Sequence, residues 1–255
     1  MKKLFLLVCF YTSFQNIHAQ IIPENYVIVH GAWGGAWDWK KVDSLLSATG
    51  NKVYRVTLTG LGEKYHLANA KIGLYTHIYD VVNTILFEDL HNVVLVGHSY
   101  GGMVITGVAD SLSSRIKRLV YIDALLPNNG ENVISAKGAG VSERLKQMSA
   151  NLTKDSLIIP TWVKAGAMFP KDVPHPAKTF LDTLWLKNKA ALKLPATYIL
   201  TVDAGKKPEE DDFAVFADRA KKRGFTYYQM DNTGHTPERS KPRELVELML
   251  PPKKQ

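Results

Sequence analysis

Residues 92–102, with the sequence NVVLVGHSYGG, decide the fold of this chain. The apolar run Val93–Val96 predicts a buried strand, and the residues from 102 to 111 predict a helix. Between them, Gly97-His98-Ser99-Tyr100-Gly101 has the G-x-S-x-G spacing of a nucleophile elbow, a sharp strand-to-helix turn that exposes a serine. Side chains two residues before and after the serine would collide in such a turn, so glycine fits both positions. We therefore expect Ser99 to be a nucleophile at the carboxyl edge of a sheet.

Other runs rich in Val, Ile, Leu and Tyr alternate with helical patterns along the chain. Strands are expected at 26–30, 52–57, 92–97, 118–123, 196–202 and 225–230, and helices at 36–48, 76–87, 102–111, 212–223 and 242–250. Most of the strands are continuously apolar, which is typical of strands covered on both faces. The alternation predicts an α/β fold with a mostly parallel, doubly wound sheet of about six strands.

Residues 127–194 break this alternation. They contain no convincing strand and are too many for a simple loop, but they hold apolar helical fragments punctuated by proline. We expect a helical lid inserted over Ser99, which divides the core into residues 20–126 and 195–255. A second packing layer without a role in substrate binding is the alternative.

Residues 1–19 have the pattern of an export signal, with Lys2 and Lys3, a short apolar core and a small-residue cleavage site before Gln20. The segment is too short to span a bilayer, and a buried N-terminal element is the alternative. The pattern predicts a periplasmic or secreted protein without a stable membrane span. The single cysteine, Cys9, lies in this segment, so the mature chain would have no disulfide and no thiol nucleophile.

Charge and motifs exclude several other classes of function. The formal net charge is +8, but the basic residues are scattered and no aromatic platform accompanies them, which argues against nucleic-acid binding. No H-E-x-x-H metal motif is present, and Gly60-Leu61-Gly62 lacks the third glycine of a dinucleotide fingerprint. We expect no metal, no cofactor and a small-molecule partner, in a monomer or a homodimer.

A serine nucleophile needs a histidine base and an acid that orients it. His235 follows the last predicted strand, which suits the chain order serine, acid, histidine. Asp203 and Asp123 each end a predicted strand at the carboxyl edge, and Asp203 is the preferred acid with Asp123 as the alternative. Asp211 and Asp212 are more distant candidates.

Two backbone N–H groups are expected to form the oxyanion hole. One belongs to Tyr100, directly after the nucleophile, and the other to Ala32 in the glycine-rich loop His30-Gly31-Ala32-Trp33-Gly34-Gly35. Glycines there allow a substrate to approach the backbone closely. The residues expected to contact substrate come from this loop and from the insertion: Gly31, Trp33, Trp162 and Phe169.

These segments resemble a known group of proteins. The stretches 29–37, 57–63, 94–103 and 119–127 are similar to those of bacterial esterases of the α/β-hydrolase fold, which are related to plant salicylate-binding methylesterases and hydroxynitrile lyases. The resemblance implies a cofactor-independent triad of Ser99, His235 and Asp203, with Ala32 and Tyr100 as oxyanion donors. It also implies esters of modest size with an apolar or aromatic acyl part.

The function predicted from the sequence is a serine carboxylesterase that works through an acyl-enzyme intermediate. A hydroxynitrile lyase is one alternative, but the resemblance places threonine and lysine in lyases where this chain has Gly31 and Thr236. A ligand-binding receptor built on a hydrolase fold is another alternative, and an amidase or lactonase would need only a different lid and pocket.

Overall fold

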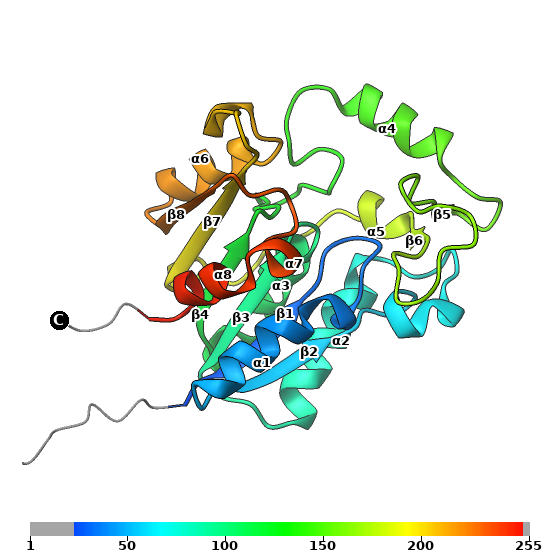
Figure 1. Ribbon diagram of the computed structural model, residues 1–255. Helices are drawn as coiled ribbons and strands as arrows, with labels where there is room; N and C mark the ends of the chain where they lie inside the picture. The colour runs from blue at the N-terminus through cyan, green and yellow to red at the C-terminus, as the bar shows by residue number, and fades with distance from the viewer. Residues whose placement is uncertain (1–22, 252–255) are drawn as a thin grey trace, which may run out of the picture.

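The computed structural model describes residues 23–251, and its centre is a sheet of six parallel strands (Figure 1). The strands are β1 (Asn25–Val29), β2 (Lys52–Val56), β3 (Val93–His98), β4 (Ile116–Ile122), β7 (Ala196–Val202) and β8 (Thr226–Asp231). Every residue of β3 is buried, as its continuous apolar run predicts, whereas the edge strands β2 and β8 are partly exposed. The six predicted strands and the doubly wound α/β sheet are confirmed. The export signal predicted at 1–19 lies outside the described residues.

The strand order, β2-β1-β3-β4-β7-β8, determines where a site forms. The chain first builds outward from β1 to β2 and then crosses to β3 on the other side of β1. The direction of winding therefore reverses between β1 and β3, and in open α/β sheets the crevice outside the carboxyl ends at such a point binds ligands. Ser99 follows β3 directly, so the topology places it at this crevice.

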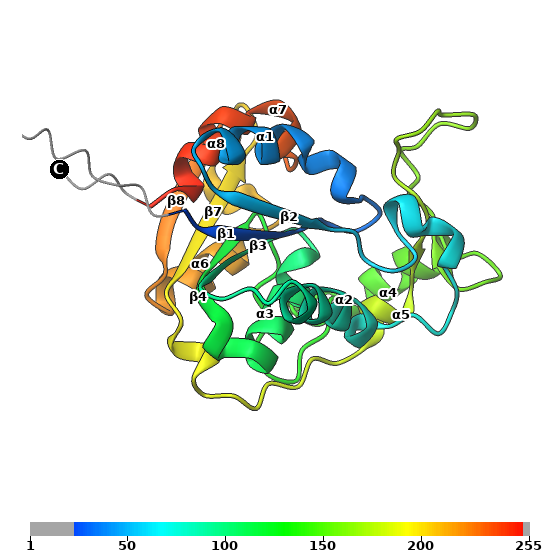
Figure 2. The same ribbon diagram turned by 90° about the horizontal axis from the view of Figure 1, so that it is seen from below.

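Helices cover both faces of the sheet, as Figure 2 shows in the view from below. On one face lie α1 (Lys40–Ala48), α7 (Pro237–Ser240) and α8 (Pro242–Met249), and on the other lie α2 (Leu74–Phe87), α3 (Gly101–Leu112) and α6 (Ala214–Lys222). The helix expected at 36–48 is divided into a 3-10 turn, η1 (Ala36–Trp39), and α1. The other predicted helices are present with small shifts of their ends.

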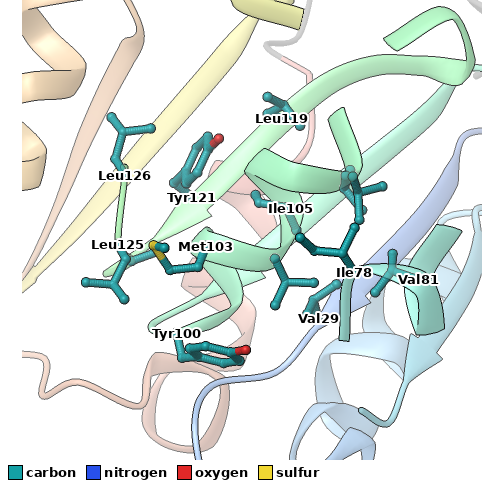
Figure 3. Packing of buried hydrophobic residues seen from close by; sticks show 14 of the residues in the cluster. Val29, Ile78, Val81, Tyr100, Met103, Ile105, Leu119, Tyr121, Leu125 and Leu126 are labelled. Carbon is teal, nitrogen blue, oxygen red and sulfur yellow. The ribbon is translucent and has the colours of Figure 1, made fainter. Parts of the chain in front are cut away.

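The larger core lies between the sheet and α2, α3 and α6 (Figure 3). Ile78, Val81, Val82 and Ile85 form the buried stripe of α2 at three- and four-residue spacing, as an amphipathic helix requires. Each such side chain stabilises the fold by about 1.5–3 kcal/mol when it is fully buried. This packing fixes α3, whose N-terminal end begins just after Ser99.

The insertion, residues 127–194, joins β4 to β7 and contains α4 (Val141–Ala150), β5 (Leu157–Ile158), β6 (His175–Pro176), α5 (Lys178–Leu181) and a 3-10 turn, η4 (Ala191–Lys193). The part that holds α4, β5, β6 and α5 lies beyond the carboxyl ends of the strands, and the chain then returns to the amino end of β7 (Figure 1). The short antiparallel pair β5–β6 corrects the expectation that the insertion holds no strand. Two-residue strands carry too little periodicity to be recognised in a sequence. Among residues 23–251, no helix is both long and apolar enough to cross a membrane.

Candidate active site

Ser99 occupies the turn between β3 and α3, as the motif predicts. Its φ is +53°, a left-handed conformation that is costly for a residue with a side chain. The end of β4 holds this turn, because the Ser99 N–H donates to the Ile122 carbonyl at 3.2 Å and the Ser99 carbonyl accepts from the Leu125 N–H at 3.0 Å. The neighbouring strand therefore maintains the strained backbone that presents the hydroxyl.

The two glycines of the motif are required by their surroundings. A Cβ atom at Gly97 would lie 2.8 Å from the Gly101 carbonyl oxygen, and one at Gly101 would lie 2.6 Å from the Val29 carbonyl oxygen. Contacts this short would force the backbone apart. The expected collision is therefore real, although the clashing partner in each case is backbone and not the other side chain.

His235 lies on the loop after β8, and this loop brings its side chain to Ser99. Its Nε2 is 2.9 Å from Ser99 Oγ, and its Nδ1 is 2.6 Å from Asp123 Oδ2. The buried carboxylate of Asp123 accepts a hydrogen bond from Nδ1–H. The lone pair of Nε2 then faces the hydroxyl of Ser99. Phe213 stacks on the imidazole at a centroid distance of 4.7 Å and fixes the plane of the ring.

The prediction that Asp203 is the carboxylate partner of His235 is wrong, and Asp123 takes this place. Asp123 is 1% exposed, and its Oδ1 accepts the Thr201 N–H at 3.3 Å. The Asp203 side chain is 49% exposed and pairs with Lys206 at 2.8 Å. The reason is topological, since β4 is the immediate neighbour of β3 whereas β7 is one strand farther away.

His98 supports the loop that carries His235, a role that the sequence does not predict. Its Nε2–H donates to the His235 backbone carbonyl at 2.6 Å, and the two rings lie 4.8 Å apart. Burial holds the pKa of His98 well below its usual value, so the ring stays neutral. The only signal in the sequence is its position in the G-x-S-x-G motif, next to Ser99.

The loop after β1 is fixed by His30. The His30 Nδ1–H donates to the Gly31 carbonyl at 2.7 Å, and Nε2 accepts the Leu58 N–H at 3.1 Å. Burial lowers the pKa of His30 to about 4, so this single tautomer persists at neutral pH. His30 thus braces the loop that carries Ala32. Within residues 23–251, the backbone N–H groups of Ala32 and Tyr100 donate to no backbone or side-chain acceptor.

Trp33 joins this loop to the insertion. Its φ is +63°, and each of its polar groups binds the insertion. The backbone N–H donates to His175 Nδ1 at 3.2 Å, and the carbonyl accepts the Val173 N–H at 2.9 Å. The indole N–H donates to the Ile158 carbonyl at 3.0 Å. The insertion therefore holds the strained residue that follows Ala32.

A cavity of about 310 Å³ opens at Ser99 and His235. Three of the four predicted substrate contacts line it, namely Gly31, Trp33 and Trp162. The fourth, Phe169, does not: it packs on Tyr65 at a centroid distance of 5.4 Å and lines a separate hollow. Phe169 is one of several aromatic residues of the insertion, and only the path of the chain separates it from Trp162, which lines the cavity.

Part of the cavity lining is charged. Arg239 binds Asp38 through two hydrogen bonds of 2.6 Å and reaches Asp172 of the insertion at 3.3 Å. The Trp162 indole N–H donates to the other oxygen of Asp172 at 2.7 Å. Hydrogen bonding to Asp38 raises the pKa of Arg239 above its usual value. These four residues, none of them close in sequence to Ser99, link α7, η1 and the insertion.

Comparison with known proteins agrees with this geometry. Residues 26–248 match the model of the alpha/beta hydrolase family, which is most of the chain. The chain belongs to the alpha/beta hydrolase family.

Two curated relatives match parts of this hydrolase. A carbendazim hydrolyzing esterase of Nocardioides sp. (strain SG-4G) is 47% identical over 111 residues, which are 44% of this chain and 46% of that esterase. An alpha-hydroxynitrile lyase of Arabidopsis thaliana is 33% identical over 106 residues, 41% of each chain. The matches thus span less than half the length of these relatives.

A solved structure matches over a longer stretch. It is an extracellular alpha/beta-hydrolase from a Paenibacillus species, described as sharing structural and functional homology with tobacco salicylic acid binding protein 2. The TM-score is 0.71 at 25% identity, and the match covers 89% of this chain and 98% of that one. The predicted resemblance to bacterial esterases related to the plant proteins is confirmed.

Proposed function

We propose that this protein is a serine carboxylesterase in which Ser99, His235 and Asp123 form the catalytic triad. The observation that carries the proposal is the continuous hydrogen-bonded series from Ser99 Oγ through both nitrogens of His235 to the buried Asp123 carboxylate. The contacts suit the three roles that the chemistry requires: a hydroxyl that donates to Nε2, an imidazole that accepts this proton, and a carboxylate that accepts a hydrogen bond from Nδ1–H. The esterase among the curated relatives supports the same reaction class.

Acylation begins when Ser99 Oγ attacks the ester carbonyl and His235 Nε2 takes the hydroxyl proton. Asp123 stabilises the imidazolium that forms, and its burial keeps water from competing for the Nδ1 proton. The backbone N–H groups of Ala32 and Tyr100 receive the oxyanion, since they have no acceptor of their own within residues 23–251. The imidazolium then protonates the leaving alcohol, and the acyl group stays on Ser99.

Deacylation repeats these steps with water as the nucleophile. His235 takes a proton from water, the hydroxide adds to the acyl carbonyl, and the oxyanion again forms between Ala32 and Tyr100. Collapse of this intermediate breaks the bond to Ser99 Oγ, which regains its proton from His235. The acid product leaves and the triad returns to its starting state.

The cavity supports substrates of modest size. A volume of about 310 Å³ is at the small end of ligand pockets, which are about 300–1,000 Å³. Trp33 and Trp162 meet edge to face at 5.0 Å on one wall and suit an apolar or aromatic acyl part. Because the insertion supplies Trp162, we assign the insertion the role of a lid over Ser99. The leader pattern and the extracellular neighbour together support a location outside the cytoplasm.

The geometry around Gly31 supports ester hydrolysis over hydroxynitrile cleavage. A Cβ atom at this position would lie 3.0 Å from His98 Nδ1 and 3.1 Å from Ser99 Cβ. The threonine that the resemblance places here in lyases would crowd the nucleophile. A mandelonitrile cleavage assay tests this choice, and we expect turnover of esters without release of cyanide.

Labelling with a fluorophosphonate, followed by peptide mapping, tests the proposed nucleophile. We expect one labelled peptide, carrying the probe on Ser99, and no labelling of the Ser99→Ala variant. A chromogenic ester series of increasing acyl length then measures the pocket, and short acyl chains should give the highest kcat/KM. Labelling elsewhere, or ester turnover that survives Ser99→Ala, would contradict the proposal.

A further inference from the structure

The cavity at Ser99 contains a carboxyl group that the triad mechanism leaves unused. Glu238 lies on α7, shortly after His235, and lines the same cavity. Its side chain is 2% exposed, yet its Oε2 has no hydrogen-bond partner among residues 23–251. A buried polar atom normally finds a partner, so an unpartnered oxygen on a residue that lines the cavity points to a ligand.

The neighbouring cation is already engaged by other carboxylates. Arg239 directs its Nε and one terminal nitrogen to Asp38 at 2.6 Å, and the same terminal nitrogen reaches Asp172 at 3.3 Å. Glu238 Oε1 lies 4.0 Å from Arg239 Nε, outside hydrogen-bond distance. Glu238 is thus the third carboxyl group around a single arginine.

This environment determines the protonation state of Glu238. Burial raises its pKa to about 8. The hydrogen bond from its own backbone N–H and the charge of Arg239 act in the opposite direction, whereas the charges of Asp38 and Asp172 raise the pKa further. At neutral pH the group is therefore mostly an uncharged acid. Because Oε1 is the oxygen nearer the guanidinium, the proton belongs on Oε2, which makes the unpartnered atom an O–H donor.

We propose that Glu238 is a substrate-recognition residue whose Oε2–H donates a hydrogen bond to an acceptor on the ester, away from the scissile carbonyl. The preferred substrates are then esters that carry an aromatic ring nitrogen or a second carbonyl. An analogue without the acceptor leaves the buried donor unpaired in the complex, which lowers its kcat/KM relative to an ester that carries the acceptor. This inference rests on the proposed esterase activity of Ser99.

Isosteric ester pairs test the contact on either side of the scissile bond. Methyl nicotinate against methyl benzoate places a ring nitrogen in the acyl part, and 3-pyridyl acetate against phenyl acetate places it in the alcohol part. The measurement is the ratio of kcat/KM within each pair, for the wild type, Glu238→Gln and Glu238→Leu. The glutamine amide is a matched control, because it keeps a neutral N–H donor, whereas leucine removes the donor.

We expect the wild type and Glu238→Gln to favour the ring nitrogen in one pair by about three- to tenfold relative to Glu238→Leu, the size of one net hydrogen bond. In the wild type this preference should be full at about pH 6.5 and lost by about pH 9.5, because the ionised carboxylate no longer donates. In Glu238→Gln it should not change with pH. Any pH dependence of the hydrolysis step itself cancels in the ratio, since both esters of a pair use the same triad.

Equal ratios in all three proteins would overturn the inference while leaving the esterase intact. A wild-type preference that rises with pH would also overturn it, because that result requires a carboxylate acceptor. Absence of hydrolysis of all four esters and of the chromogenic series would instead reject the proposed function itself. If Glu238→Leu fails to fold, the contrast in pH dependence between the wild type and Glu238→Gln decides the question.

Discussion

The carboxyl ends of β4 and β7 each present an aspartate, and the two ends differ in what surrounds them. Asp123 at the end of β4 is buried, receives the Thr201 N–H and meets His235 Nδ1 at 2.6 Å. Asp203 after β7 is half exposed and pairs with Lys206. A carboxylate in solvent is screened and exchanges partners, whereas a buried one must keep its partner. Burial beside β3, more than position at a strand end, therefore determines which aspartate pairs with His235.

The loop that carries His235 shows the same contrast. It meets β7 through the backbone, where the Thr233 N–H donates to the Val202 carbonyl at 2.9 Å. It meets β3 and β4 at His235 itself, through His98 and Asp123. The β7 end thus supports the path of the loop, and the β3 and β4 ends position the imidazole.

Asp123 and Asp203 can differ in their effect on catalysis only if the reaction occurs at Ser99. The largest loss of kcat should therefore come from Ser99→Ala. We expect kcat to fall by about 10⁴-fold or more, since the base then has no hydroxyl to activate. Steady-state turnover of a chromogenic ester measures the loss. Ser44→Ala, an exposed change on α1, is the control and should leave kcat unchanged. Comparable activity in the two variants would place the chemistry elsewhere.

Asp123→Asn should give the next largest effect. The amide keeps the size of the side chain but cannot stabilise the imidazolium, so we expect kcat to fall about 10³- to 10⁴-fold with a smaller change in KM. Circular dichroism and thermal melting should show a folded protein. A loss below about tenfold would mean that another carboxylate orients His235.

His98→Ala should have an intermediate effect. Removal of the Nε2–H donor releases the His235 carbonyl, and we expect kcat to fall about tenfold because the imidazole is less well placed. KM should change little, which separates this result from damage to the cavity. Unchanged kcat would show that Asp123 alone positions the ring.

Asp203→Asn should have the smallest effect. Its ion pair with Lys206 is solvent-exposed, so kcat should stay within about twofold of the wild type and stability within about 1 kcal/mol. Parallel assays of the Asp123 and Asp203 variants on one ester measure the contrast. Similar losses of kcat in both variants would contradict the proposed difference in role between Asp123 and Asp203.

Much of the fold, and the pairing of Ser99 with His235, could be predicted because the sequence patterns that indicate them are local. The strand, glycines and helix around Ser99 lie within a few residues of one another, and buried parallel strands appear as continuous apolar runs. His235 could be predicted as the partner of Ser99 because it comes directly after the last strand. These features depend on the spacing of residues along the chain, which can be read from the sequence alone.

The acid and parts of the pocket depend on spatial neighbours. Both Asp123 and Asp203 end strands, and only the order β3-β4-β7 reveals which is closer to Ser99. Trp162 and Phe169 belong to the same aromatic-rich insertion, but the path between them sends one to the cavity and the other to Tyr65. Glu238 resembles any surface glutamate of a short helix until burial is known.

Proton NMR of the His235 Nδ1–H tests the paired carboxylate most directly. A short hydrogen bond to a buried carboxylate shifts this proton far downfield and protects it from exchange with water. We predict that the wild type and Asp203→Asn show the resonance and that Asp123→Asn lacks it. A signal that survives in Asp123→Asn and disappears in Asp203→Asn would contradict the account.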